Sequence, residues 1–239
     1  MASAALIVTC EHGGNRIPAP FGALFDGHAV LLNSHRGFDA GALTMARTLA
    51  RRFGAPLVSA TVSRLLIDLN RSRGHPKLFS EVTRRLPARQ RAQIVEQHYL
   101  PHRLRIEHLV RQAVQQHGQA VHLASHSFCP ELDGRVRSAD VGLLYDPSRA
   151  GEVALCARWK DALALLAPAL RVRRNYPYAG KDDGLTAHLR KTFPASAYLG
   201  IELEVNQAIV AVGGRRWAAL RAALSAALAL ALAPTARGT

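Results

Sequence analysis

Residues 4–18 read AALIVTCEHGGNRIP and predict a strand that runs straight into a polar loop. A short apolar run bounded by turn residues is typical of a strand buried on both faces. The two glycines and Asn15 are enough to form a turn. Glu11 and His12 are not needed for that turn, so they indicate ligands or catalytic groups at the carboxyl end of the strand.

Strand-like and helix-like patterns alternate along the rest of the chain. This alternation predicts an α/β fold with three layers, a mainly parallel mixed sheet and helices on both of its faces. Further short apolar runs, each expected to be a strand, lie at 55–62, 120–127, 141–146 and 197–205. Helical patterns lie between them at 40–53, 88–117 and 151–170.

The chain shows no internal repeat and no low-complexity linker, so residues 1–239 are expected to form a single domain. Pro101 stands inside the longest helical pattern and should kink or break that helix. A last apolar helix is expected to begin after Gly213 and Gly214 and to end before Pro234. Arg221 interrupts this segment, which is mostly alanine, so it does not predict a membrane span.

Composition limits the classes of function. Of 239 residues, 49% are hydrophobic and 20% are charged, the balance of an ordinary globular protein, and the net charge is +14. The arginines are scattered and few aromatic residues accompany them, so they favour a small anionic substrate over nucleic acid. Three cysteines without a C-x-x-C motif indicate a reducing compartment. With no signal-peptide pattern at the N-terminus, we expect a cytoplasmic location. Nothing in the sequence indicates an oligomeric state.

Polar side chains follow four of the predicted strands. α/β proteins usually form their binding and catalytic sites at the carboxyl ends of such strands. His12 and His126 form a plausible pair of zinc ligands, since imidazole suits zinc and a catalytic site needs three protein ligands. Asp39, at the start of a predicted helix, is the first candidate for the third ligand, and His35 is the second. Each of these residues also has a structural interpretation. Asp39 could equally be a helix N-cap, and His35 could be a loop residue hydrogen-bonded to the backbone. Either strand-end histidine could be a core residue whose ring is hydrogen-bonded to a carbonyl group.

Two glutamates and two arginines could carry the remaining chemistry. Side chains alternate between the two faces of a strand, so this period of two places Glu202 and Glu204 on the same face of an apolar strand. A buried carboxylate there could act as general base for a metal-bound water. Arg71 could polarise a carbonyl group or hold a substrate carboxylate, and Arg137 could do the same. Other residues expected to face the substrate are Asn70, Ser127, Asn175 and Tyr178.

Seven motifs occur in one order between about residues 5 and 210, and together they resemble the N-formylglutamate amidohydrolase family. The motifs are CEHGGNRIP, HRGFDAGA, DLNRS, ASHSFCP, RSADVGLLYDP, NYPYAGKDDGLT and YLGIELEVNQ. That family is similar to the zinc carboxypeptidases and aspartoacylases. The resemblance implies a zinc-carboxypeptidase-like fold with an eight-stranded mixed sheet, and hydrolysis of N-formyl-L-glutamate to L-glutamate and formate.

The resemblance also implies roles for individual residues. His12 matches the first zinc histidine, the Asn70–Arg71 pair matches an Asn-Arg pair, and His126 with Ser127 matches a later His-Ser. Glu204 is favoured over Glu202 as the catalytic glutamate. One position departs from the related enzymes, because Asn15 replaces the glutamate of their H-x-x-E zinc motif. A neutral amide is a poor zinc ligand, which again directs attention to Asp39.

Two other functions remain open from the sequence. One is a different hydrolase on the same scaffold, either a carboxypeptidase or a deacylase for another N-acyl amino acid. The other is a binding protein that has kept the fold and lost its metal, which Asn15 would permit.

Overall fold

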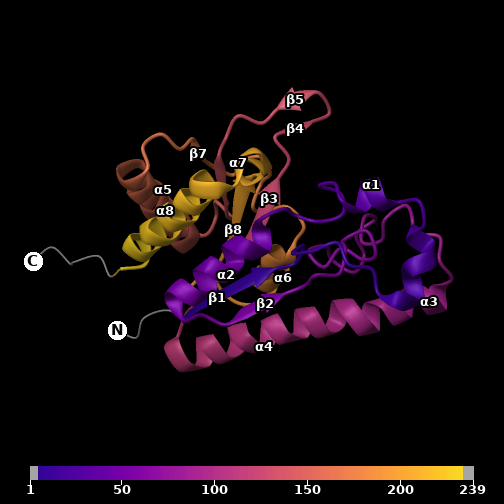
Figure 1. The fold of residues 1–239 in the computed structure, drawn as a ribbon. Coiled ribbons are helices and arrows are strands. Elements are labelled where there is room, and N and C mark those ends of the chain that lie inside the picture. Colours follow the sequence, from indigo (N-terminus) through magenta and orange to yellow (C-terminus); the bar gives the residue numbers. More distant parts are fainter. Residues whose placement is uncertain (1–4, 234–239) are drawn as a thin grey trace, which may run out of the picture.

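A computed structural model describes residues 5–233 of the protein (Figure 1). Helices and strands alternate in it as the sequence predicts. The strands are β1 (Ala5–Cys10), β2 (Leu57–Ser59), β3 (Ala120–Phe128), β4 (Glu131–Leu132), β5 (Arg135–Val136), β6 (Val141–Leu144), β7 (Val172–Arg174) and β8 (Tyr198–Asn206). The longer helices are α2 (Ala42–Phe53), α3 (Ala88–Ile94), α4 (Leu100–His117), α5 (Ala150–Leu166), α6 (Leu185–Thr192) and α8 (Gly214–Leu232). Shorter ones are the 3-10 helix η1 (Ala19–Phe25), α1 (Ala29–Leu32), the π-helical turn η2 (Val95–Tyr99) and α7 (Gln207–Val212).

The central sheet has six strands in the order β2-β1-β3-β8-β6-β7. Strands β2, β1, β3 and β8 are parallel, β6 is antiparallel to β8, and β7 is parallel to β6. The prediction of a mainly parallel mixed sheet is therefore confirmed, with six strands in the described sheet rather than the eight that the resemblance implied. A separate hairpin of β4 and β5 projects from the end of β3, and the sequence analysis did not predict it (Figure 1).

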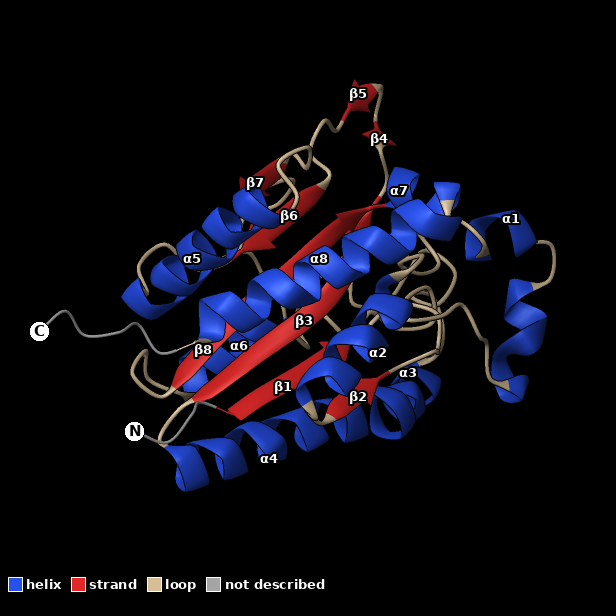
Figure 2. Cartoon of the chain, turned by 60° about the vertical axis from the view of Figure 1, so that its left-hand side comes forward, coloured by secondary structure: helices blue, strands red, loops and turns tan. Residues whose placement is uncertain are grey.

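Helices cover both faces of the sheet, as Figure 2 shows. Alternate residues of a strand point to opposite faces, so each strand contributes to two cores. On one face, Leu199, Ile201 and Leu203 of β8 pack in a buried cluster with residues of α2, α5 and α8. On the other face, Tyr198 packs with residues of α4 and α6. Glu202 and Glu204 share the face of Tyr198, as period two predicts.

The prediction of a strand over 55–62 is wrong for most of that segment. The strand β2 has only three residues, and beyond it Val62 forms an isolated bridge to Arg16. The following apolar run, which includes Leu66 and Ile67, is buried in a third core cluster beside η1. These residues are apolar because they fill the core of an irregular segment, and hydrophobicity alone cannot distinguish that from a strand.

Pro101 does not break the helical segment that contains it. It lies at the start of α4, directly after the π-helical turn Val95–Tyr99. Proline lacks the backbone N–H that an α-helix interior needs, and a wider turn before it is one known way to accommodate this. The predicted last helix is confirmed as α8, although it begins at Gly214 itself.

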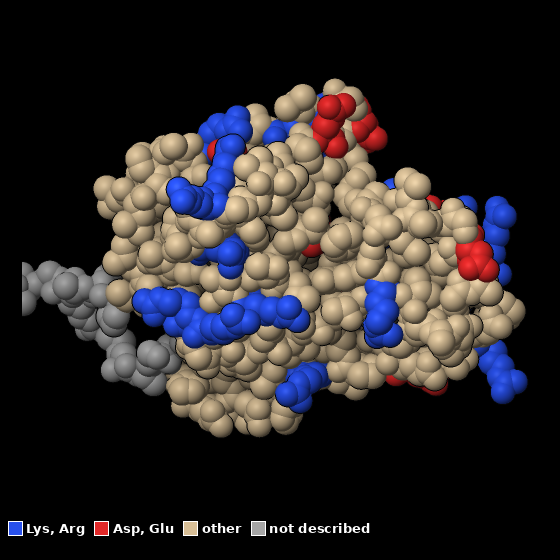
Figure 3. Space-filling model, in the orientation of Figure 1, with Lys and Arg blue, Asp and Glu red and all other residues tan. Residues whose placement is uncertain are grey.

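Two surface properties bear on possible partners. In the described part of the chain, no helix is both long enough and apolar enough to cross a membrane. On the face shown in Figure 3, lysines and arginines lie in several separate groups, which matches their scattering along the sequence.

A buried ion pair between α5 and α6 also contacts β8 and the loop that precedes α6. Glu152 of α5 accepts hydrogen bonds from Arg190 Nε at 3.0 Å and from the N–H of Gly200 at 3.0 Å. Arg190 also donates to the carbonyl oxygens of Gly180 and Gly200. Both side chains are almost entirely buried. Because Gly180 belongs to the loop that carries Tyr178, this pair fixes one wall of the pocket described below.

Substitution of Arg190 by methionine should lower the free energy of unfolding by about 3–5 kcal/mol, because Glu152 would be left as an unpaired buried charge. Urea denaturation followed by circular dichroism would measure this change. The matched control is Arg111→Met, which breaks the exposed pair with Glu107 and should cost less than about 1 kcal/mol. Equal, small losses for both variants would show that the Glu152–Arg190 pair does not stabilise the fold.

Candidate functional site

The candidate site is a cavity of about 150 Å³ at the carboxyl ends of β1, β3 and β8. It lies where parallel α/β sheets usually bind their ligands. His126 and Glu204 are direct neighbours in the register of β3 and β8. The residues singled out from the sequence that line the cavity are His12, Asp39, Asn70, Arg71, His126, Ser127, Tyr178, Glu202 and Glu204.

The glycines after His12 let the first loop pack tightly. The N–H of Gly13 donates to the carbonyl oxygen of Ala60 at 2.9 Å. A Cβ atom on Gly14 would lie only 2.8 Å from the carbonyl oxygen of Thr61, which is too close for any side chain. The N–H of Asp39 donates to the carbonyl oxygen of His12 at 2.9 Å, so this backbone geometry sets His12 beside Asp39.

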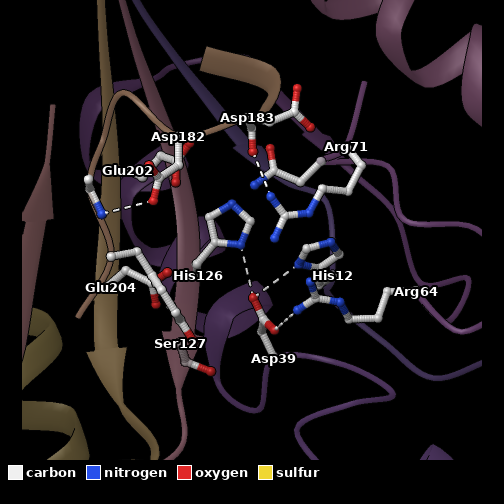
Figure 4. Close-up of a pocket in the computed structure, with 13 residues that line it drawn as sticks. His12, Asp39, Arg64, Arg71, His126, Ser127, Asp182, Asp183, Glu202 and Glu204 are labelled. Atoms are coloured by element: carbon white, nitrogen blue, oxygen red, sulfur yellow. Dashed lines mark hydrogen bonds and ion pairs between the residues drawn. The ribbon is translucent and has the colours of Figure 1, made fainter. Parts of the chain in front are cut away.

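Asp39 lies between the two histidines (Figure 4). Its Oδ2 atom is 3.2 Å from Nδ1 of His12 and 2.9 Å from Nδ1 of His126. One ligand atom from each of the three residues lies within 4.8 Å of the other two, and all three residues are buried. Two imidazoles and a carboxylate with this spacing form a donor set that suits zinc.

The outer nitrogen of each histidine faces a second carboxylate. Nε2 of His12 is 2.7 Å from Oδ1 of Asp68, and Nε2 of His126 is 3.1 Å from Oε2 of Glu11. In metal sites, ligating histidines characteristically direct the other ring nitrogen toward a carboxylate, which fixes the ring and increases its basicity. This second layer therefore fits a metal bound through the two Nδ1 atoms.

Electrostatics favour positive charge on this cluster. Burial alone would lower the pKa of His126, but hydrogen bonds to Asp39 and Glu11 and their charges raise it well above its ordinary value. Burial would likewise raise the pKa of Asp39, yet His12, His126 and Arg64 hold it below its ordinary range. The buried carboxylates thus stabilise a cation at this position, whether protons on the rings or a metal between them.

Arg64 is a site residue that the sequence analysis missed. It donates to Asp68 at 2.7 Å and to Asp39 at 3.3 Å, and so connects the inner and outer carboxylates. Arg64 precedes Asp68 by four residues in the irregular segment that follows β2. Because residues 64–68 form neither a helix nor a strand, the sequence offered no periodic signal for this pair.

Glu204 and Glu202 differ in their contacts. Glu204 is only 5% exposed, and its Oε2 atom has no hydrogen-bond partner among the described residues. Burial raises the pKa of Glu204 to about 8, and the nearby His126 opposes that rise. Oε1 of Glu202 instead accepts a hydrogen bond from the Thr186 hydroxyl at 2.7 Å. Glu204 therefore has the freer carboxylate and the one better placed to exchange a proton.

Arg71 and Asn70 line the opposite wall. One guanidinium nitrogen of Arg71 donates to the carbonyl oxygen of Asp183 at 2.8 Å, an interaction drawn in Figure 4. The side-chain oxygen of Asn70 accepts from the N–H of Leu185 at 2.7 Å, at the start of α6. Asn70 thus holds the wall in place, while Arg71 keeps donors available to a ligand.

Four other residues considered from the sequence lie outside the cavity. Arg137 donates to the Tyr178 hydroxyl at 3.0 Å and lies over its ring, so it contacts a lining residue rather than the cavity. The side-chain oxygen of Asn175 accepts from two backbone N–H groups and shapes its own loop. Asn15 bonds to Asn33 at the surface, and His35 lines a neighbouring cavity.

The charges that line the cavity favour a cation. Two guanidinium groups, Arg64 and Arg71, face five carboxylates. The carboxylates belong to Asp39, Asp182, Asp183, Glu202 and Glu204. A divalent metal would offset part of this excess of negative charge.

A mainly parallel sheet with a polar, carboxylate-rich pocket at its carboxyl edge defines an α/β enzyme scaffold. The chain belongs to the N-formylglutamate amidohydrolase family, whose model matches residues 4–211. Membership in an amidohydrolase family makes the chain a hydrolase of N-acyl amino acids by class. The resemblance seen in the sequence is thus confirmed.

Two solved structures share the fold over nearly the whole chain. The gene product Atu2144 from Agrobacterium tumefaciens is 29% identical, with a TM-score of 0.79, covering 97% of this chain and 91% of that one. The N-formylglutamate amidohydrolase from Ralstonia eutropha JMP134 is 20% identical, with a TM-score of 0.69, covering 97% and 94%. No curated protein matches the chain.

The histidine and aspartate cluster predicts stoichiometric metal binding. Zinc-supplemented protein should hold one equivalent after dialysis, measured by elemental analysis, because two imidazoles and a carboxylate converge. Substitution of His126 by alanine should abolish this binding. Asp68→Asn keeps the inner residues and should weaken zinc affinity by about 10–100-fold.

The control for these variants is His117→Ala, which removes an exposed histidine at the end of α4 and should retain one equivalent of zinc. Retention of full zinc by the His126 variant would show that the metal, if any, binds elsewhere.

Proposed function

We propose that this protein hydrolyses the amide bond of N-acyl amino acids, with N-formyl-L-glutamate as substrate, and that it does so with a zinc ion held by His12, Asp39 and His126. The observation that carries the proposal is the position of Glu204, a buried carboxylate beside His126 on the neighbouring strand, with one oxygen that has no hydrogen-bond partner within residues 5–233. Family membership supports the reaction class, and the donor set supports the metal.

Hydrolysis of the formyl amide requires a water oxygen to bond to the formyl carbon and the C–N bond to break. Bound zinc would supply Lewis acidity and lower the pKa of a water molecule in the site. Glu204 accepts the proton of the attacking water and donates it to the departing nitrogen, so that formate and the free amino acid are released. An exchange of this kind needs a pKa near the operating pH, which burial of Glu204 favours.

Arg71 places a positively charged guanidinium group on the opposite wall of the pocket. A guanidinium group binds a carboxylate through two parallel hydrogen bonds, which positions as well as attracts it. We propose that Arg71 binds a carboxylate of the substrate and that Asn70 and Tyr178 shape the same wall. Ser127 lies at the pocket edge, where its hydroxyl donates to the carbonyl oxygen of Ala40.

Substitution of Glu204 by glutamine keeps the shape of the side chain and removes the base. The variant should retain zinc while kcat falls by about two to four orders of magnitude, the usual contribution of a positioned base. Release of formate from N-formyl-L-glutamate is the assay. Glu202→Gln, on the same strand face, is the matched control and should lose far less. Loss of activity in the control alone would move the base to Glu202, and full activity of both variants would remove this mechanism.

Substitution of Arg71 by lysine keeps the charge but loses the two-pronged geometry. KM for N-formyl-L-glutamate should rise about tenfold or more, because a lysine cannot form both parallel hydrogen bonds. Steady-state kinetics with thermal denaturation as a folding check would measure it. Assays of N-acetyl-L-glutamate and a short free peptide in parallel separate a formyl-specific enzyme from a general deacylase or a carboxypeptidase. An unchanged KM would place Arg71 outside substrate binding.

A further inference from the structure

A second cavity of about 430 Å³ adjoins the catalytic pocket, and we name it the basic vestibule. Arg64 and Tyr178 line both cavities and so form the boundary between them. Small-molecule sites commonly enclose roughly 300–1,000 Å³. The catalytic pocket alone is smaller than that, at about 150 Å³, so the vestibule offers room for a part of the substrate that the pocket cannot hold.

The vestibule carries an excess of positive charge. Its lining includes four cationic side chains, Arg36, Arg64, Lys77 and Arg84, and two carboxylates. Both carboxylates are already paired, Asp68 with Arg64 at 2.7 Å and Glu81 with Arg36 at 2.6 Å. Within the described residues, Lys77 and Arg84 form no ion pair with any carboxylate.

A histidine that lines the vestibule also lies near its cationic side chains. His35 lines the cavity, and its pKa is lowered by partial burial and by the charges of Arg36, Arg64 and Arg137, which outweigh the opposing charge of Asp39. The contribution of the three guanidinium groups to this lowering agrees with the excess of cationic side chains around the vestibule.

The two cavities thus have opposite charge. The catalytic pocket has more carboxylates than cations and suits a metal, and Arg71 is its one guanidinium without a carboxylate partner among the described residues. A substrate with several carboxylates therefore cannot place all of them in that pocket. The vestibule has the complementary charge, and the side chains of Leu65 and Phe79 provide apolar wall for a carbon chain.

We infer that the basic vestibule is a subsite for a carboxylate-bearing extension of the substrate, bound by Lys77 and Arg84. The preferred substrates are then N-acyl amino acids with an anionic group beyond the first amino acid, either on a second residue or at the far end of the acyl group. This inference rests on the proposed hydrolysis and names its substrate class.

Two pairs of compounds test the subsite and distinguish the two positions of the extension. N-formyl-L-glutamyl-L-alanine is compared with its C-terminal amide, N-formyl-L-glutamyl-L-alaninamide, and N-succinyl-L-glutamate with the amide of its succinyl carboxylate, N-succinamoyl-L-glutamate. Each pair differs in one carboxylate and hardly in shape. Wild-type protein should favour the carboxylate member of at least one pair over the amide member in kcat/KM, and the pair that shows this preference identifies the side of the extension.

The double variant Lys77→Ala/Arg84→Ala should lower that carboxylate-to-amide ratio by about tenfold, the effect of two exposed charge pairs. Arg85→Ala is the matched control, since Arg85 is the exposed neighbour of Arg84 outside the cavity lining, and the ratio should not change. A wild-type protein with no charge preference in either pair, or a ratio that the double variant leaves unchanged, would overturn the subsite.

Calorimetric binding of the same four compounds separates this inference from the proposed function. Charge-dependent binding that the double variant loses, without hydrolysis of any compound, would support the subsite and contradict the proposed activity. Hydrolysis that the double variant leaves unchanged would support the proposed activity and contradict the subsite.

Discussion

The arrangement of the site depends on one carboxylate oxygen, Oδ2 of Asp39, which lies between the Nδ1 atoms of His12 and His126. His126 lies in β3, His12 lies two residues beyond the end of the neighbouring strand β1, and Asp39 comes from the loop before α2. Outer carboxylates and Arg64 hold the rings and the aspartate in turn. Buried charges of this kind are tolerable only when each is paired, so loss of any member should disturb the others.

The sequence was sufficient to predict which residues converge at the centre of the candidate site. His12, His126 and Glu204 follow or end apolar runs that become parallel strands, and the carboxyl ends of parallel strands meet at one edge of a sheet. Asp39 could be proposed because it lies just before a predicted helix whose start faces that edge. The fold class followed from the same alternation of strands and helices.

Other parts could not be predicted because they depend on tertiary contacts without a periodic signal. The apolar run around Leu66 resembles a strand but fills the core of an irregular segment, and Arg64 and Asp68 within it reach the site only through that packing. Arg137 and Asn175 are polar loop residues of the expected type. Which side of a loop a side chain occupies is decided by partners such as Tyr178, which local sequence does not reveal.

The central claim is that His12, Asp39 and His126 hold one metal ion. Crystals of zinc-supplemented protein, measured above and below the zinc absorption edge, test it most directly. The account predicts a single anomalous peak about 2.0–2.2 Å from Nδ1 of both histidines and from a carboxylate oxygen of Asp39. Fully supplemented crystals with no anomalous peak among these three residues, or with a peak at another position only, would contradict it.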